Sequence, residues 1–256
     1  MGCSNSRDSS LEGIDQEALT EFENELGLKN ISAETIVNVF HSYSKAGLIT
    51  KNQLNAACID SKVNLNLNQN FLDRFSDEGR ILVKKIICLG ILLGKGEAIE
   101  KVCLLFETYA SSRESNLLSQ SQLEEMITDL IEISCLTIPN YVLSLNKHDP
   151  ELRRYVSKIA IITPSMINYH TYMFTETFDR ITLEQFKDKI ANDKLLHLLS
   201  TKFIRTFAIQ MFMNMVKPAE NAMKKNKDKK RTKKSATSYE KLPSVKPKLG
   251  KSNSMI

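Results

Sequence analysis

The two residues best suited to a chemical reaction lie at the N-terminus, and each would accept a fatty acyl chain. The sequence begins Met-Gly-Cys-Ser-Asn-Ser, which fits the M-G-x-x-x-[ST] pattern for N-myristoylation of Gly2. Cys3 beside it is a natural S-palmitoylation site. Because a single myristoyl chain holds a membrane only marginally, stable anchoring needs a second signal. We expect residues 1–14 to form a lipidated segment on the cytosolic face of a membrane; the alternative is a chance match in a cytoplasmic protein.

A strongly basic tail offers a further membrane signal. Lys217–Ile256 holds 13 Lys or Arg against 3 Asp or Glu, a net charge of +10, so the rest of the chain carries −5 of the total of +5. Few apolar residues interrupt the tail, so we expect residues 217–256 to be disordered. Such a charge favours an anionic membrane surface, although a solubilising tail and a polyanion- or nucleic-acid-binding tail are alternatives. The body has no RNA-stacking motif, which makes nucleic acid the weaker choice. The candidate anion-binding residues are Lys224, Lys225, Lys227, Lys229, Lys230, Arg231, Lys233 and Lys234.

The remaining reactive side chains match no catalytic or zinc-binding pattern. The cysteines are scattered without a C-x-x-C pair, which argues against a zinc site and against a disulfide framework and favours a reducing compartment. The four histidines form no H-E-x-x-H motif, and the glycines form no phosphate-binding loop. No secretory signal peptide is visible, and no apolar run approaches the ~18 residues of a transmembrane helix. We expect a protein that is not an enzyme and holds no metal.

Most of the chain between the N-terminal segment and the basic tail has apolar residues at helical spacing. The pattern predicts an all-α protein in which only short segments around Ile49, Ile81 and Ile181 are extended. Ser32 is a plausible N-cap of the helix that follows it. The last predicted helix, Asp193–Val216, is long and has two neighbouring apolar rows. The other predicted helices are Asp15–Leu28, Gln53–Cys58, Lys84–Leu93, Ile99–Tyr109, Ser121–Ile133, Leu152–Ile162 and Leu183–Ile190.

The body contains an internal repeat. Three segments read aliphatic, hydroxyl, two variable residues, Gln and a large apolar residue, namely Ile49–Leu54, Leu118–Leu123 and Ile181–Phe186. Tyr43–Ile49 and Phe75–Ile81 also share an aromatic residue, a serine, a glycine and a final isoleucine. The unit is a helix, a turn, one aliphatic residue and a second helix, which is the outline of an EF-hand. In that unit the aliphatic residue at loop position 8 pairs with the neighbouring loop in a short β bridge.

These features make the sequence resemble the EF-hand superfamily, in particular a divergent neuronal calcium sensor of the recoverin type. The clearest stretch is Leu89–Ala110, with the N-terminus and Ile181–Leu199 in support. Good resemblance covers about half the chain, roughly 31–126 and 175–200, and calcineurin B-like proteins share the architecture. The resemblance implies two pairs of helix-loop-helix hands. The first pair would occupy residues 15–98, and the second, with a long extra helix, residues 99–216.

The calcium chemistry that the resemblance implies is missing from the loops. A working loop supplies oxygen ligands from positions 1, 3, 5, 7 and 9 and a bidentate Glu at position 12. With the aliphatic residue fixed at position 8, no loop has a carboxylate at position 1 or 12. We therefore expect no calcium site, and a sensor with noncanonical loops is the alternative. The four loops run over Ser42–Gln53, Arg74–Lys85, Ser111–Gln122 and Phe174–Gln185.

A hand pair without ion switching can still hold a helix of a partner protein. EF-hands accept an amphipathic helix in an apolar groove, and Met-rich surfaces adapt well to such a ligand. We expect a membrane-anchored signalling adaptor with degenerate calcium loops. The final helix would contribute anchor residues for the partner or lie in the groove itself; the alternative is that it is simply an extra core helix. We expect Cys135–Met173 to be an elaborated linker between the third and fourth hands. The candidate partner-binding residues are Phe40, Tyr43, Phe75, Phe106, Tyr109, Phe203, Phe207 and Met211.

Overall fold

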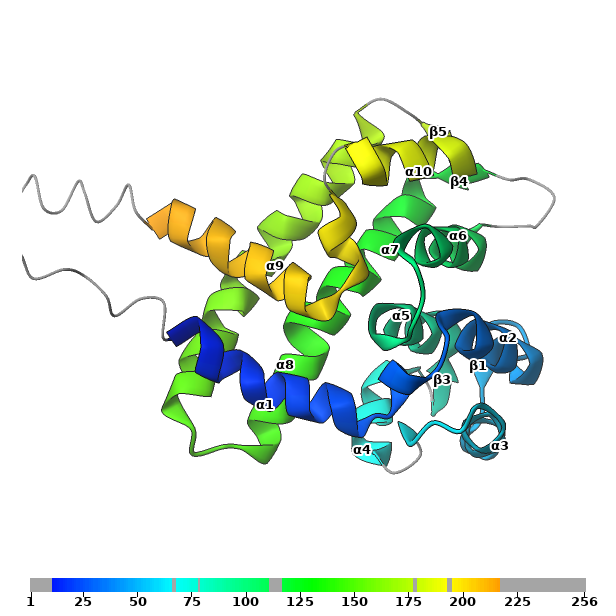
Figure 1. Cartoon of the computed structure of the whole chain (residues 1–256), viewed down its shortest axis with the longest axis horizontal. Helices are drawn as coiled ribbons and strands as arrows, with labels where there is room; N and C mark the ends of the chain where they lie inside the picture. The colour runs from blue at the N-terminus through cyan, green and yellow to red at the C-terminus, as the bar shows by residue number, and fades with distance from the viewer. Residues whose placement is uncertain are drawn as a thin grey trace, which may run out of the picture. The chain divides into compact units, whose positions relative to one another are not determined.

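The computed structural model describes residues 11–65, 68–77, 79–110, 117–176, 179–192 and 195–216, and the side chains of 11–15, 69 and 192 are left out. This part of the chain is mostly helical, as the sequence predicts, with two small antiparallel sheets (Figure 1). The described residues up to Phe212 form one compact unit, and the chain from Met213 onward belongs to another. The first unit thus includes both segments that we assigned to separate hand pairs, 15–98 and most of 99–216.

The first part of the unit consists of short helices joined by tight turns. Ser32 caps α2 through a 3.0 Å hydrogen bond that its hydroxyl accepts from the Thr35 amide, as its sequence position indicates. The elements in order are α1 (Leu11–Glu25), η1 (Leu28–Asn30), α2 (Ala33–Tyr43), β1 (Leu48–Ile49), α3 (Lys51–Ser61), α4 (Gln69–Leu72), η3 (Asp73–Phe75), β2 (Ser76–Asp77), β3 (Arg80–Leu82) and α5 (Val83–Leu93).

The second part contains two helical stretches of 26 residues. α7 continues through a π-helical turn, η4, into α8, and the 26-residue α9 follows. The elements are α6 (Ala98–Tyr109), β4 (Leu117–Ser119), α7 (Gln120–Glu132), η4 (Ile133–Thr137), α8 (Ile138–Leu145), α9 (Pro150–Thr175), β5 (Arg180–Thr182), α10 (Leu183–Asn192) and η5 (Leu195–Leu199). A final helix spans residues 201–216.

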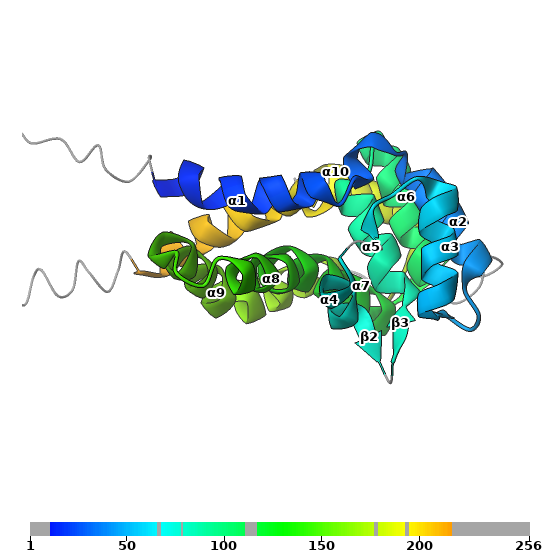
Figure 2. The same ribbon diagram turned by 90° about the horizontal axis from the view of Figure 1, so that it is seen from below.

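The short strands link the helix–turn–helix units in pairs. β1 runs antiparallel to β3, with Ile49 opposite Ile81, and β2 pairs with the other edge of β3. β4 runs antiparallel to β5, with Leu118 opposite Ile181. All four of these aliphatic side chains are buried. The predicted extended segments around Ile49, Ile81 and Ile181 are therefore confirmed, and Figure 2 shows β2 and β3 forming a hairpin at one edge of the unit.

Close packing of α2 on α5 organises the core of the first part. A Cβ atom at Gly90 would lie 2.5 Å from Cγ2 of Ile36, so only glycine permits this approach. Phe40 on α2 and Ile86 and Ile87 on α5 are fully buried. The helix predicted over Lys84–Leu93 is thus present as α5 and lies in the core of the first part.

One prediction about the second part is wrong. Residues 193–216 do not form one helix, because η5 ends at Leu199, Ser200 breaks the pattern, and an α-helix starts again at residue 201. The spacing-four rows concealed the break because both segments keep apolar residues on the buried side. The stretch expected to be an elaborated linker, Cys135–Met173, consists of the rest of η4, then α8 and most of α9.

One stretch, Gln120–Leu145, is long and apolar enough to cross a membrane, among the residues that the structure describes. Polar residues interrupt every apolar run in this stretch, so no single run indicates a membrane span. Of its most apolar window, 67% is buried against other parts of the protein. A core helix passes the same length and hydropathy test, and the burial of Met126, Leu130 and Ile138 fits such a helix.

Candidate partner-binding site

The twelfth residue of the first loop is occupied by an interaction within the protein. Gln53 Oε1 accepts a hydrogen bond of 3.0 Å from the Thr50 amide, and Thr50 Oγ1 accepts one of 3.3 Å from the Gln53 amide. This reciprocal pair is a capping box, which satisfies free amides at the start of α3. The third and fourth loops repeat the arrangement at α7 and α10, through Ser119 with Gln122 and Thr182 with Gln185.

The second loop uses its twelfth residue differently. Lys85 extends from α5 to α7, where its ammonium lies 3.3 Å from Asp129 and 3.9 Å from Glu132. The start of α5 lacks a side-chain cap at Leu82. Lys85 therefore links α5 to α7 through ion pairs, whereas a calcium-binding loop would have a ligand at this position.

The described donors of the first loop do not fit calcium. Ser42 and Ser44 donate their hydroxyls to the carbonyls of Val39 and His41, at 2.8 and 2.9 Å. A pocket of about 300 Å³ between the first two loops is lined by Lys45, Leu48, Ile49, Thr50, Gln53 and Arg80. Its two cations would repel a divalent ion. Across the described ranges, no group of three or more His, Cys, Asp or Glu side chains is placed to hold a metal. Residues 78, 111–116 and 177–178 of the loops lie outside those ranges.

Most of the predicted partner-binding residues of the hands are core residues in this conformation. Phe40, Phe75, Phe106 and Tyr109 are almost wholly buried. Tyr43 is half-buried at the end of α2 and donates a hydrogen bond to Asp60. A partner would reach the four buried rings only after the helices had moved apart, so they do not form a preformed groove.

Tyr109 belongs to a buried polar contact instead. Its hydroxyl donates a 2.7 Å hydrogen bond to Asp129, the carboxylate that also pairs with Lys85. Burial raises the pKa of Tyr109 well above its ordinary value and also raises the pKa of Asp129, although Tyr109 and Lys85 partly offset the second shift. This contact connects α5, α6 and α7.

The final helix has one buried face and one face open to solvent. Ile204, Ala208 and Ile209 pack inward. Phe203 is 58% exposed, and the predicted anchors Phe207 and Met211 are half-buried. The helix is therefore in part the extra core helix that the sequence allowed, but its apolar surface is wider than the core covers.

A buried ion pair fixes the inner face of this helix. Arg205 is fully buried, and its Nη1 donates a 2.7 Å hydrogen bond to Glu23 of α1 and lies 3.5 Å from the Ser134 carbonyl. Its Nε and Nη2 atoms are buried without a hydrogen-bond partner. Burial opposes the charge of Arg205, but Glu23 outweighs it and the pKa of Arg205 is raised. Beside it, burial raises the pKa of the Cys135 thiol to about 12, so this cysteine is an inert core residue.

Sequence reasoning missed Arg205 and Glu23, although one signal was present. Arg205 is the only charged residue between Lys202 and Lys217, inside an otherwise apolar helical pattern. A charge in that position requires a buried partner. No local pattern indicates that the partner is Glu23, because the two residues lie far apart in the chain.

Two histidines and two aromatic rings join η5, α9 and the final helix. Nε2 of His170 lies 2.8 Å from Nε2 of His197, and Nδ1 of His170 lies 2.8 Å from the Met166 carbonyl oxygen. Because a carbonyl only accepts, His170 Nδ1 carries the proton and its Nε2 accepts from His197. Phe207 stacks on His197 with ring centroids 4.5 Å apart and also packs on Tyr169 at 6.0 Å. Burial lowers the pKa of His170 to about 4.

These contacts join α9 to the final helix at a place where both helices carry partly exposed aromatic and methionine side chains. We call the set of Tyr169, Tyr172, Phe203, Phe207 and Met211 the aromatic ridge. Tyr169 and Tyr172 come from α9 and are exposed, and the other three come from the final helix. The contact between Tyr169 and Phe207 joins the two rows. Aromatic and methionine side chains are the types enriched at protein interfaces.

The predicted lipidation residues Gly2 and Cys3 lie outside the described residues. So do the predicted anion-binding residues of the tail, Lys224, Lys225, Lys227, Lys229, Lys230, Arg231, Lys233 and Lys234. Both assignments stay predictions from the sequence.

Comparison with known proteins found no matching family model, no matching curated protein and no matching solved structure.

Proposed function

We propose that this protein is an EF-hand-like adaptor, anchored to the cytosolic face of a membrane by acylation of Gly2 and Cys3, that binds an amphipathic helix of a signalling or membrane protein without calcium. Calcium-independence rests on one observation, namely that the residue at the twelfth position of each loop is engaged in a contact within the protein. Gln53, Gln122 and Gln185 cap helices, and Lys85 pairs with Asp129. None of these side chains is available as a calcium ligand.

The pairing of the units supports the EF-hand part of the proposal. Ile49 lies opposite Ile81 and Leu118 opposite Ile181, the register that position 8 of paired hands requires. Two helix–turn–helix units are thereby linked in each pair. The aliphatic residues of the repeated segments thus pair with one another, as position 8 does in an EF-hand pair.

The aromatic ridge is the surface that we assign to the partner helix. Phe203 and Phe207 are four residues apart, so they lie on one face of the final helix and present a linear apolar row. An amphipathic helix that places its own apolar row against them would cover Phe203, which the protein leaves 58% exposed. The fully buried aromatics Phe40, Phe75, Phe106 and Tyr109 would stabilise the fold and not contact the partner.

Calorimetric titration of the purified full chain tests calcium-independence. We expect no binding heat with calcium up to the millimolar range and the same result with magnesium. Micromolar binding would overturn the loop argument and favour a calcium sensor with noncanonical loops.

Site-specific photo-crosslinking tests the partner surface. A photoreactive residue in place of Phe203 should crosslink to a helical segment of a membrane or signalling protein equally well with calcium and with a chelator. Ile59 on α3 is the matched control, because it is 71% exposed but lies outside the ridge. Equal crosslinking from both positions would contradict the assignment of the ridge.

A further inference from the structure

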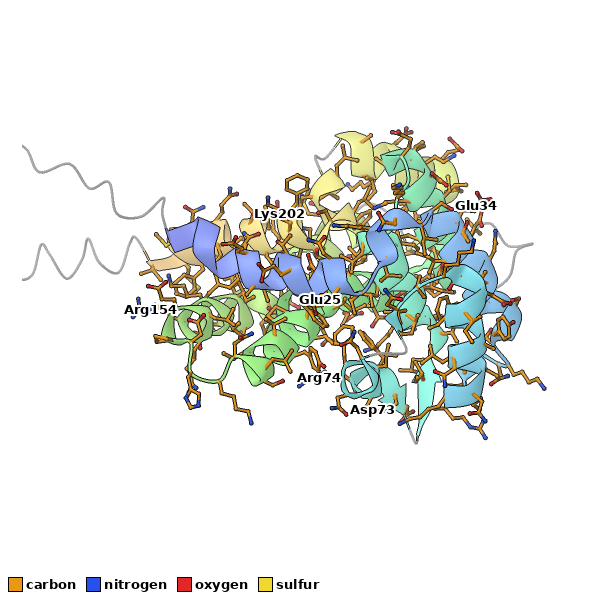
Figure 3. All side chains as sticks on the ribbon, turned by 60° about the horizontal axis from the view of Figure 1, so that its bottom comes forward. Glu25, Glu34, Asp73, Arg74, Arg154 and Lys202 are labelled. Atoms are coloured by element: carbon orange, nitrogen blue, oxygen red, sulfur yellow. The ribbon has the colours of Figure 1, made fainter. Side chains whose placement is uncertain are left out.

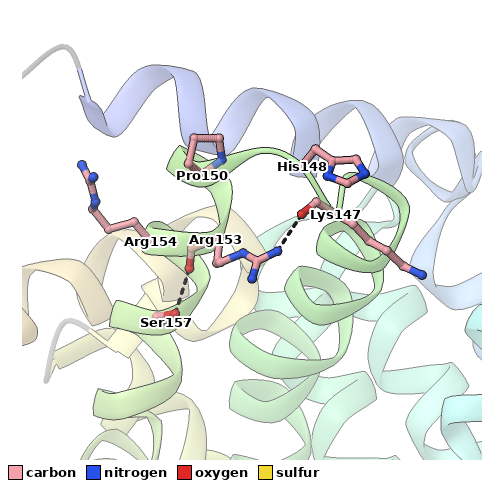
Figure 4. A pocket seen from close by; sticks show the side chains of 6 residues that line it. All are labelled: Lys147, His148, Pro150, Arg153, Arg154 and Ser157. Carbon is pink, nitrogen blue, oxygen red and sulfur yellow. Dashed lines mark hydrogen bonds between the residues drawn. The ribbon is translucent and has the colours of Figure 1, made fainter.

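A basic pocket lies where the α8–α9 turn meets the first turns of α9. It has a volume of about 550 Å³ and is lined by Lys147, His148, Pro150, Arg153, Arg154 and Ser157 (Figure 4). Ligand sites in proteins commonly span 300–1,000 Å³. Three of the six lining residues carry a permanent positive charge, and the lining includes no carboxylate. The composition of the pocket fits an anion.

The cations of this pocket are not neutralised by the protein. Within the described residues, no ion pair engages Lys147, Arg153 or Arg154, although Arg153 donates a 2.6 Å hydrogen bond to the Lys147 carbonyl. The nearby carboxylate of Asp149 caps α9 by accepting from the amides of Glu151 and Leu152. The amides at that helix end are therefore already used, and any anion would be held by the side chains.

The acidic helix α1 does not fill the pocket. Its ribbon passes beside the lining residues in Figure 4, but none of its described carboxylates lines the pocket or pairs with these cations. Glu23, the buried one, is paired with Arg205.

The position of the pocket points to a membrane as the source of the anion. Figures 1 and 2 both place the start of α9 at the end of the compact unit where α1 begins, and Figure 3 shows Arg154 at that same end. α1 begins at Leu11, so the predicted acylation site Gly2 precedes it by nine residues. An extended segment of that length reaches at most about 30 Å. An acyl chain on Gly2 would hold this end of the protein close to the lipid headgroups.

We propose that the pocket formed by Lys147, His148, Arg153 and Arg154 binds the phosphorylated headgroup of an anionic membrane lipid, a phosphoinositide. Arginine forks and lysine ammonium groups bind phosphate oxygens strongly, and several phosphate groups on one ring use several cations at once. This inference deepens the proposed function and rests on it for the presence of the membrane. It gives the folded body a lipid contact separate from the tail and fixes which end of the adaptor faces the bilayer.

Vesicle binding by the full, non-acylated chain tests the pocket apart from the acyl anchor and from the partner helix. The probes are phosphatidylcholine vesicles that contain a phosphoinositide and, at equal surface charge, vesicles that contain phosphatidylserine. The variant Lys147→Gln/Arg154→Gln removes two cations and leaves the hydrogen bond of Arg153 to the backbone in place. The control Lys29→Gln/Arg180→Gln removes the same charge from two exposed residues of η1 and β5.

The pocket variant should bind phosphoinositide vesicles on the order of thirty-fold more weakly than the natural sequence, since each basic residue near an anionic surface contributes about fivefold. The control should change binding less than about twofold, and the natural chain should prefer phosphoinositide over phosphatidylserine. Equal loss in both variants, or no loss in the pocket variant, would show that the tail binds by charge alone and would overturn the inference. Inositol trisphosphate or inorganic phosphate binding as tightly as the vesicles would overturn the membrane as the source. Neither result would affect the adaptor proposal, which the crosslinking experiment tests.

Discussion

The paired turn units and a second group of helices, which we call the outer layer, are stabilised in different ways. The turn units repeat a local device, the capping box, at α3, α7 and α10, and join in pairs through strands of two or three residues. The outer layer of α1, α8, α9 and the final helix relies on contacts between residues distant in sequence, above all Glu23 with Arg205. The first region is thus specified locally and redundantly, whereas the second depends on a few long-range contacts.

This comparison predicts that the outer layer contains the most damaging single substitution. Arg205→Met leaves Glu23 buried without a partner, and we expect the free energy of unfolding to fall by about 4 kcal/mol. Urea denaturation measures the loss. Lys187→Met is the control, because the Lys187–Glu184 ion pair is exposed on the Glu184 side and its loss should barely change the free energy of unfolding.

A double variant separates the ion pair from the packing around it. Glu23→Leu/Arg205→Met removes both charges and should recover most of the stability, because no uncompensated charge remains. A double variant as unstable as Arg205→Met would contradict the dominant role of the ion pair in the outer layer.

The outer layer should also make stability depend on pH. The pKa of His170 lies at about 4, below its ordinary value near 6.5, so the folded state resists protonation there. The stabilisation is complete above pH 6.5 and is lost as the pH falls toward 4, at a cost of up to about 3 kcal/mol. Denaturation of the natural chain and of His170→Gln at several pH values measures it. An unchanged slope in the variant would assign the dependence to other groups.

Loss of a single capping side chain should lower the free energy of unfolding less than loss of the ion pair, and by similar amounts in different turn units. Thr50→Ala and Thr182→Ala each remove one capping side chain, and each should lower the free energy of unfolding by about 1 kcal/mol. Thermal or urea unfolding of both variants measures the two losses. A loss of more than about 3 kcal/mol at either site would mean that the turn units are not redundant.

The smallest expected effect is a gain. Ala46 in the first loop has a φ angle of 51°, a left-handed conformation that costs a residue with a Cβ about 1 kcal/mol. Ala46→Gly relieves this cost but loses more entropy on folding, so we expect a gain of about 0.5 kcal/mol. Gly47→Ala, at φ 76°, is the opposite substitution and should destabilise the same loop. A gain from both would contradict the strain argument.

The sequence predicted the turn units better than the outer layer for a physical reason. Ile49, Leu118 and Ile181 recur in a fixed pattern with a hydroxyl and a glutamine, so their positions follow from the repeat. That same pattern is the signature of a capping box, which we interpreted only as part of a loop. The structural role of Gln53 is therefore present in the sequence, in the three-residue spacing between Thr50 and Gln53.

Few features of the outer layer can be recognised from short patterns in the sequence. The break at Ser200 is invisible in hydropathy because apolar residues continue on both sides of it. The partners Glu23 and Arg205 belong to opposite ends of the chain, and no spacing rule relates them. The basic pocket depends on how α8 turns into α9, so Lys147 and Arg154 look like ordinary surface charges in the sequence.

The π-helical turn η4 sets the rotation of α8 relative to α7 within one continuous helical stretch. Before it, Asp129 faces Lys85 of α5, and after it begins, the carbonyl of Ser134 lies near Arg205. A π turn contains one residue more than the α-helical turn it replaces. Deleting one residue from Ile133–Thr137 would restore a regular helix but rotate α8 by about 100° relative to α7. Tyr141, whose ring centroid lies 5.0 Å from that of Phe22 and 5.1 Å from that of Phe71, would then turn away from both, so this single extra residue sets the orientation of α8 in the core.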